Sequence, residues 1–475
     1  MKTIKYSLIT LVAFILCATN SNAQMAKSAY FLDGSFYNHQ LNPAMKPERA
    51  YFSLLTGTWS VAANSNFGIS NFLYPYGDDK LTTFMSSHVD QDKFLNSLPN
   101  SLQMSSDIST NLLGLGFRMF GGFTTFGITL NSSVSTNLPK GFFEFAKKGF
   151  QESSYSFSGI NMNTMNYASI NLGYSREVVE GLRVGVTAKY LVGLAYANMN
   201  VDKLNIHMSE DKWMIESHAT AEAALYTEMT IDAGAMDELN EPRIPLVDAL
   251  NNSTDMSTIM QAAKPAAKGL AVDLGVSYDF GDLVEGLSVS ASLLDLGSIN
   301  WKYMTKFSTE DGKVEFDGID EIDPNDFEGS LDKELEALGE DIEKMFSIPY
   351  SHGTQAYRTK LSPVMYLGAE YNMPFYHGLS VAMLYGKRFG TYGGWDEVRG
   401  YLNIAPLKWI EASANVGYST YGTTFGWMFN FHPRVFSFFI GSDYMITKVT
   451  PQYIPVNNLN SHITFGITKP IGKRK

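Results

Sequence analysis

The chain has 475 residues, enough for three average soluble domains or for one large transmembrane barrel. Charged residues make up only 18 %, below the roughly 25 % of typical soluble domains, while aromatic residues reach 13 %. The formal net charge of −12 argues against nucleic acid as the main partner. The one cysteine, Cys17, excludes a disulfide scaffold, a cysteine metal site and a cysteine nucleophile.

Residues 1–23 have the pattern of a cleaved secretory signal peptide. A basic start is followed by an apolar run over 8–18 and by small residues up to Ala23. This run is too short for a comfortable membrane span. An uncleaved anchor and a lipoprotein signal at Cys17 are the alternatives. We expect export and a mature chain that begins at Gln24.

No later stretch offers 18 uninterrupted apolar residues, which excludes helical membrane spans. Residues 182–196 instead alternate, with an apolar residue at every even position. Sandwich strands usually end after about six residues, whereas a run of about fifteen is long enough to cross a bilayer at a tilt. The same alternation recurs at 168–175, 270–280, 410–418 and 425–432.

The sequence therefore predicts an all-β fold, a transmembrane antiparallel β-barrel of about fourteen strands within a range of about 12–16. The strands are expected at 51–63, 109–119, 123–133, 166–176, 182–200, 268–280, 287–296, 361–371, 379–389, 397–405, 408–420, 424–432, 434–444 and 460–469. Every second connection is short and contains turn residues, whereas most of the others are long. This sorting predicts tight turns in the periplasm and large loops outside. Segments 66–75 and 213–230 are candidates for two further strands.

Three segments outside the strands have features of their own. Residues 24–50 are expected either to fold into the lumen of the barrel (51–475) as a hatch or to form a tail. Residues 140–150 predict a short amphipathic helix, whose phenylalanines need burial in the barrel mouth or against a neighbouring loop. The link 297–360 is strongly acidic and has helical spacing over 327–346.

This acidic link has two interpretations. It could form a solvated surface, or it could bind a divalent cation, although its spacing does not match an EF-hand loop. The candidate ligands are Asp317, Asp320, Glu321, Asp323 and Asp326.

Catalytic motifs are absent from the sequence. The eight histidines form no H-E-x-x-H pattern or close metal pair, and neither a G-x-S-x-G elbow nor a Walker motif occurs. We predict no enzyme, no cofactor and no metal site; a surface hydrolase assembled from scattered residues is the alternative. Charged side chains that face the predicted lumen could brace a plug or tune a channel. They are Arg118, Arg183, Lys189, Asp273, Asp279, Glu370 and Glu411.

Several short motifs resemble those of a Bacteroidota outer-membrane β-barrel family, similar to FadL-type fatty acid transporters and to the PorV- and PorP-like proteins of type IX secretion. The motifs are Asn42-Pro43-Ala44, Tyr174-Ser175-Arg176 followed by Gly185 and Lys189, Gly269–Gly275 with Asp273, and Asp295-Leu296-Gly297. The resemblance implies a fourteen-strand barrel with a luminal N-terminal hatch. It places Asn42, Pro43 and Ala44 in that hatch.

Two functions follow as hypotheses for an outer-membrane protein. The first is passive transport of hydrophobic small molecules, with outer-membrane lipid and a hydrophobic ligand as partners; it predicts an apolar cavity reached from outside. The second is a non-enzymatic scaffold of type IX secretion or surface assembly, with envelope proteins as partners and a blocked lumen. Family analogy alone places transport slightly ahead.

Overall fold

The structure is a computed structural model. It describes residues 26–76, 80–149, 153–209, 213–225, 267–281, 283–302, 304–308, 312–316, 350–353, 357–376, 378–390, 393–445, 458 and 460–472. The expected signal peptide and the acidic residues proposed as cation ligands, 317–326, lie outside these described residues, as does the helical pattern at 327–346. No helix within the described ranges is long and apolar enough to cross a membrane.

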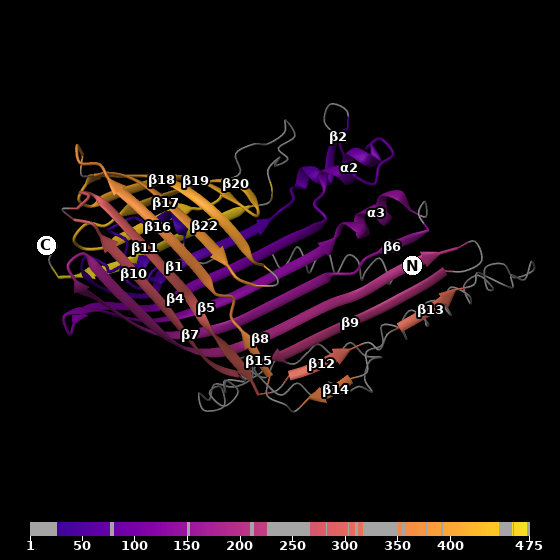
Figure 1. The fold of residues 1–475 in the computed structure, drawn as a ribbon, viewed down its shortest axis with the longest axis horizontal. Coiled ribbons are helices and arrows are strands. Elements are labelled where there is room, and N and C mark those ends of the chain that lie inside the picture. Colours follow the sequence, from indigo (N-terminus) through magenta and orange to yellow (C-terminus); the bar gives the residue numbers. More distant parts are fainter. Residues whose placement is uncertain are drawn as a thin grey trace, which may run out of the picture.

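Fourteen antiparallel strands form a closed ring (Figure 1). Each strand pairs with the next in the ring, and β22 pairs with β1 to complete it. In ring order, the strands are β1 (Ala50–Ser65), β4 (Ser101–Met119), β5 (Gly122–Pro139), β7 (Ile160–Val179), β8 (Leu182–Met208), β10 (Ala267–Asp279), β11 (Leu287–Trp301), β16 (Val364–Asn372), β17 (Leu379–Arg388), β18 (Trp395–Leu407), β19 (Ile410–Ser419), β20 (Gly422–Phe431), β21 (Ser437–Ser442) and β22 (Ser461–Ile471). Each expected strand overlaps one of these, so the predicted fold class is confirmed.

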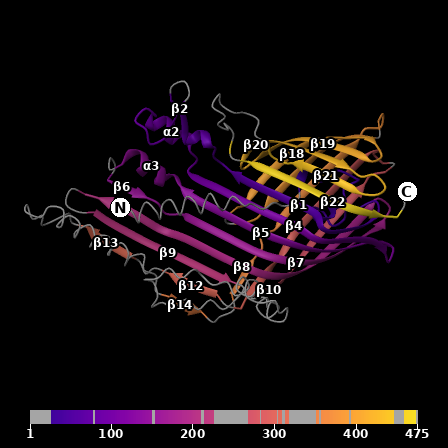
Figure 2. The same cartoon turned by 180° about the vertical axis from the view of Figure 1, so that it is seen from behind.

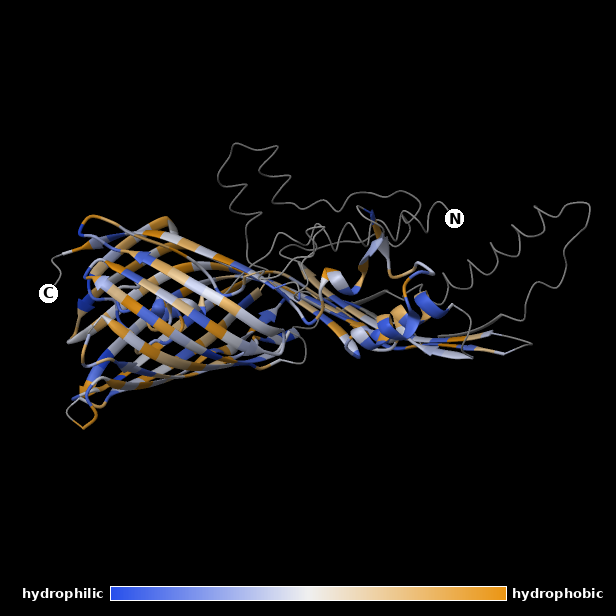
Figure 3. Ribbon diagram, turned by 90° about the horizontal axis from the view of Figure 1, so that it is seen from above, coloured by the Kyte–Doolittle hydropathy of each residue, from blue (hydrophilic) through white to orange (hydrophobic). Residues whose placement is uncertain are grey.

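The barrel closes because alternate side chains separate apolar from polar residues across the wall. On β10, Leu270 is 70 % exposed on the outer face, whereas Asp273 is buried inside. On β18, Val398 and Leu402 are exposed outside while Arg399 is buried inside. In lipid, backbone groups must pair within the sheet, and closure leaves no free edge. Figure 3 shows apolar and polar residues alternating along the strands of the barrel.

Part of the wall continues beyond the barrel as a long curved sheet (Figures 1 and 2). Strand β8 has 27 residues and β7 has 20, whereas β17, β19 and β20 have 10 each. About ten tilted residues are enough to span a bilayer. The first halves of β4 and β7 and the second halves of β5 and β8 therefore project from the mouth, and we call this projection the tongue.

Shorter elements complete the tongue. Strand β9 (Trp213–Leu225) pairs with β8, β12 (Met304–Ser308) and β13 (Gly312–Phe316), so the described part of the candidate segment 213–230 is a strand that is not part of the ring. β14 (Tyr350–Gly353) pairs with β12, β6 (Ser154–Ser156) with β8, and β15 (Tyr357–Lys360) with β11 just before β16. The other candidate, 66–75, contributes only to a separate hairpin of β2 (Leu73–Tyr76) and β3 (Lys80–Thr83).

Two α-helices lie beside this hairpin. Helix α2 (Gln91–Ser97) begins after Asp90, whose carboxylate accepts a hydrogen bond from the backbone N–H of Lys93. Helix α3 (Lys140–Lys148) forms where the amphipathic pattern predicts one. Its Phe143 ring lies 5.2 Å from that of Phe72, so this side chain is partly buried against a neighbouring loop.

Candidate functional site

The inside of the barrel contains residues 26–49, which we call the luminal segment. It has two single-turn 3-10 helices, η1 (Lys27–Ala29) and η2 (Asn38–Gln40), and no other helix or strand. Its side chains share a buried cluster with residues of the barrel wall; the luminal members include Tyr30, Phe31, Phe36, Tyr37 and Leu41. The segment is therefore packed against the wall as part of the core.

Because most of the luminal segment has no regular structure, its backbone groups find partners on the wall. The backbone N–H of Gly34 donates to both carboxylate oxygens of Glu411, at 2.9 and 3.1 Å. The Leu41 carbonyl accepts a hydrogen bond from the Ser292 hydroxyl at 2.7 Å. The wall thus holds the segment by specific polar contacts as well as by packing.

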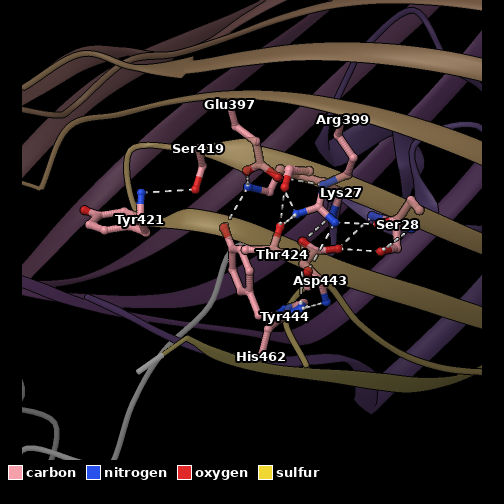
Figure 4. A network of polar contacts seen from close by, with 12 residues as sticks. Lys27, Ser28, Glu397, Arg399, Ser419, Tyr421, Thr424, Asp443, Tyr444 and His462 are labelled. Carbon is pink, nitrogen blue, oxygen red and sulfur yellow. Dashed lines mark hydrogen bonds and ion pairs between the residues drawn. The ribbon is translucent and has the colours of Figure 1, made fainter. Parts of the chain in front are cut away.

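A buried charge network anchors the start of the luminal segment (Figure 4). The Asp443 carboxylate accepts hydrogen bonds at 2.8 Å from the backbone N–H groups of Lys27 and Ser28. The Lys27 ammonium pairs with Glu397, which also pairs with Arg399. These four side chains comprise two cations and two anions, so their charges balance in a place where an unpaired charge would be costly.

Asn42, Pro43 and Ala44 form a tight turn seated on β8 and β10. The Asn42 side-chain oxygen accepts a hydrogen bond from the Ala44 backbone N–H at 3.0 Å. Gly185 faces the Pro43 carbonyl, and Gly275 faces the Asn42 side chain; at either glycine an added Cβ would lie within 2.3 Å of the turn. Only glycine leaves the space that this turn occupies.

Tyr37 of the luminal segment bridges an irregular part of the wall. The ladder between β1 and β22 is interrupted between Phe52 and Trp59, where Leu55 has a φ of +57°. The Tyr37 hydroxyl lies 2.9 Å from the Ser53 hydroxyl on β1 and 2.7 Å from that of Thr468 on β22. The luminal segment therefore links two strands whose own pairing is broken.

Burial keeps several groups of this segment uncharged. It raises the pKa of Tyr37 to about 12 and lowers the pKa of His39 to about 4, because in both cases the charged form loses its hydration. At neutral pH the His39 imidazole and the Tyr37 phenol are neutral inside the barrel.

The charged residues that were proposed from the sequence differ in what they contact. Lys189 contacts Asp273 at 2.8 Å, and also reaches Asp295, which sequence analysis did not select as a site residue, at 2.7 Å. Glu411 contacts the luminal segment, as described above, while Glu370 accepts a hydrogen bond from the Ser380 hydroxyl at 2.6 Å.

The other three lie near short turns. Arg183 pairs with Glu177, Asp279 accepts a hydrogen bond from the Gly281 backbone N–H, and Arg118 donates to the Glu48 carbonyl. Within the described part of the chain, no group of three or more His, Cys, Asp or Glu is placed to hold a metal ion.

A cavity of about 610 Å³ lies between the luminal segment and the tongue. His39, Gln40 and Leu41 line it from the luminal segment, and β4, β5, β7 and β8 contribute much of the remaining lining. Its polar lining includes the Lys189–Asp273–Asp295 cluster and a row of serine, threonine and asparagine side chains. Apolar groups are interspersed among them: Ile108, Phe126, Met165, Leu294 and Leu361. The lining is therefore mixed, whereas the transport hypothesis predicts an apolar cavity.

Sequence analysis missed several residues of these networks. Glu397 and Arg399 alternate with Val398 in an expected strand, so the signal that selected Glu411 was also present there. Asp443 lies in the expected strand 434–444, where the alternation gave it the same signal, whereas Lys27 carries none because it precedes the first strand. Asp107 and Arg388, which line the cavity, were likewise not selected.

The closed ring, the apolar outer wall and the filled lumen define an integral β-barrel of the outer-membrane type. Residues 43–443 match the family described as "Family of unknown function (DUF5723)", and the chain belongs to this family. No curated protein matches the chain.

Solved structures similar to this chain are also barrels. They include the P. putida toluene transporter TodX (8 % identity, 96 % of each chain covered, TM-score 0.40) and the CymD monoaromatic hydrocarbon channel (8 % identity, 94 % of this chain and 95 % of that one, TM-score 0.32). A third is the translocator domain of the autotransporter NalP from Neisseria meningitidis (9 % identity, 88 % and 89 %, TM-score 0.28). Likenesses at this level carry no argument about what this chain binds or moves.

Proposed function

We propose that the protein is a passive transport barrel of an outer membrane, with the tongue on the outside and the short turns in the periplasm. The observation that supports this best is the luminal cavity of about 610 Å³. Cavities of roughly 300–1,000 Å³ are of the size that holds small organic ligands. A barrel that served only to anchor the protein in the membrane would not require this cavity.

The lining suggests which small molecules fit. Met165 and Leu294 offer apolar contact, while the ammonium of Lys189 and nearby hydroxyl and amide groups offer hydrogen bonds. We therefore propose a hydrophobic cargo with a polar end, an amphipathic molecule, as the class that the cavity suits best. Sites of this kind use apolar area for affinity and a few polar groups for orientation.

A matched pair of variants tests this proposal. Ser169 is buried and lines the cavity, whereas Ala168 precedes it on β7 and points to the opposite face. Ser169→Trp fills the cavity, and Ala168→Trp puts the same ring on the outside. We expect Ser169→Trp to slow uptake of a fluorescent medium-chain fatty acid by intact cells to the rate of cells without the protein, and Ala168→Trp to leave it unchanged. Equal uptake with and without the protein would refute transport of this class.

A scaffold for protein partners is the second candidate, favoured by the tongue. This sheet projects well beyond the barrel, and transport alone does not require such length (Figures 1 and 2). The scaffold hypothesis predicts that crosslinking in intact cells captures a defined envelope protein on the tongue. A chain that crosslinks only to itself or not at all would count against it.

A further inference from the structure

An ion pair crosses the mouth of the barrel. Asp107 belongs to β4, the second strand of the ring, and Arg388 belongs to β17, the ninth. Six strands separate them in either direction around the ring of fourteen, so the two residues come from opposite walls. The Arg388 Nη1 nevertheless lies 2.8 Å from both carboxylate oxygens of Asp107.

Neighbouring contacts show that the two walls approach each other at this level. The hydroxyl of Tyr421, between β19 and β20, lies 3.3 Å from that of Ser105 on β4. A Cβ built on Gly393, between β17 and β18, would lie 3.2 Å from the Ser135 Cβ on β5. The Asp107–Arg388 contact is thus part of a constriction where the shorter wall leans over the base of the tongue.

This constriction bounds the cavity. Asp107, Arg388, Ser105, Ser135 and Gly393 all line it, as do His39 and Gln40 of the luminal segment. The ion pair therefore joins two opposite walls of the cavity, with Asp107 on β4 and Arg388 at the end of β17.

The two partners are held differently. Asp107 lies within the long strand β4, paired on both sides with β1 and β5. Arg388 is the last residue of β17, and the chain that follows contains Gly390, Gly393 and Gly394, of which Gly393 has a φ of +66°. One partner is fixed in the wall, and the other sits at a strand end followed by glycines.

Partial burial makes this contact reversible. The Arg388 and Asp107 side chains are 15 % and 17 % exposed, whereas Lys27 and Glu397 are almost fully buried. A separated Arg388–Asp107 pair can be hydrated from the open mouth, so breaking it costs far less than breaking a pair sealed in the core.

We propose that the Asp107–Arg388 ion pair is a gate that controls access from the mouth to the luminal cavity. This inference rests on the proposed transport function, because a gate matters only if the cavity receives molecules from outside. Removing either charge should leave the mouth open for a larger fraction of the time.

Chemical labelling inside the cavity tests the gate separately from transport. The sequence contains a single cysteine, Cys17, within the expected signal peptide, so Ser169→Cys places a unique thiol in the cavity of the mature chain. In intact cells, a membrane-impermeant sulfonated maleimide reports how often the mouth is open. With Asp107→Asn or Arg388→Gln added, we expect labelling to accelerate about tenfold.

Two controls separate a gate from a general loss of structure. The charge-swapped pair Asp107→Arg with Arg388→Asp should restore labelling to within about threefold of the parent, because the ion pair is rebuilt. Lys387→Gln removes the neighbouring exposed pair with Asp396, which lies 3.0 Å away, and should leave the rate unchanged. Unchanged labelling in both single variants would overturn the gate, as would equal acceleration by the swapped pair.

Fatty acid uptake measured on the same cells distinguishes the two proposals. Faster labelling together with faster uptake supports both. Faster labelling with no protein-dependent uptake supports the gate as an access device and refutes the transport of this cargo. Protein-dependent uptake that is unaffected in the single variants, with unchanged labelling, refutes the gate and leaves transport standing.

Discussion

Gly185 on β8 lies directly against the carbonyl of Pro43, so closely that an added Cβ would be 2.1 Å from the carbonyl oxygen. On β10, Val272 lies three residues before Gly275. It pairs with Ala188 of β8, the residue that directly precedes Lys189. The motifs that carried the family resemblance, separate in sequence, thus meet in one region of the lumen. There they form the seat of the Asn42-Pro43-Ala44 turn and the ion cluster of Lys189, Asp273 and Asp295.

Gly185→Ala is expected to displace the turn, because the added methyl group overlaps backbone atoms that cannot rotate away. Overpacking of this kind costs about 1–3 kcal/mol. Urea unfolding of the refolded barrel in lipid vesicles, followed by tryptophan fluorescence, would show the loss. Gly400→Ala is the control, since a Cβ at Gly400 meets nothing within 4 Å. Equal stability of the two variants would show that the turn is not held at Gly185.

Lys27→Met should loosen the luminal segment from the wall. The substitution leaves Glu397 and Asp443 with fewer opposite charges in a buried place, and breaking a buried pair costs about 3–5 kcal/mol. Limited proteolysis of the purified protein should then cleave within 26–49 while the barrel stays intact. Lys387→Met removes only an exposed pair and should leave the cleavage pattern as in the wild type. Wild-type protection of the segment in Lys27→Met would contradict the anchoring role.

His39 predicts a loss of stability in mild acid. Burial lowers its pKa to about 4 in the folded chain, while an unfolded chain has the ordinary value of about 6.5. Above pH 6.5 both states hold a neutral imidazole, and the group contributes nothing to pH dependence. Between 6.5 and 4 only the unfolded state takes up the proton, so the free energy of unfolding falls as pH falls.

The measurement compares wild type with His39→Gln at pH 7.5 and pH 5. Each pH unit within the window is worth up to about 1.4 kcal/mol for one group. Carboxylates titrate in both proteins, so the difference between the two isolates His39. Parallel pH profiles would show that His39 does not remain neutral in the folded barrel.

The ring of strands was accessible from the sequence because lipid outside and polar groups inside impose a period of two. That rule failed in the tongue: the strand expected at 109–119 begins at Ser101, and the strand expected at 166–176 begins at Ile160. Outside the bilayer neither face must be apolar, and residues 101–107 and 161–166 are rich in serine, asparagine and threonine. These two segments therefore lack the period-two pattern of apolar residues from which the strands were predicted.

Contacts across the lumen were out of reach for a different reason. On β21, Phe439 is an apolar residue on the face expected to carry polar side chains. The luminal segment explains this position, because the Phe439 ring lies 5.9 Å from the ring of Tyr37. Asp107 and Arg388 are 281 residues apart, and periodicity assigns each only to a face of its own strand. Which strand stands opposite which depends on the closure of the whole ring.

A charge on the outer wall tests whether lipid surrounds the barrel. Leu274 lies in the middle of β10 and is exposed on its outer face. Leu274→Arg should destabilise the barrel in lipid vesicles by about 2–4 kcal/mol, because the guanidinium must leave water for hydrocarbon. Leu283 is equally apolar and more exposed, but it lies in the short turn after β10, so Leu283→Arg should be tolerated. If both variants unfold at the wild-type urea concentration, the outer wall of β10 does not face lipid at Leu274.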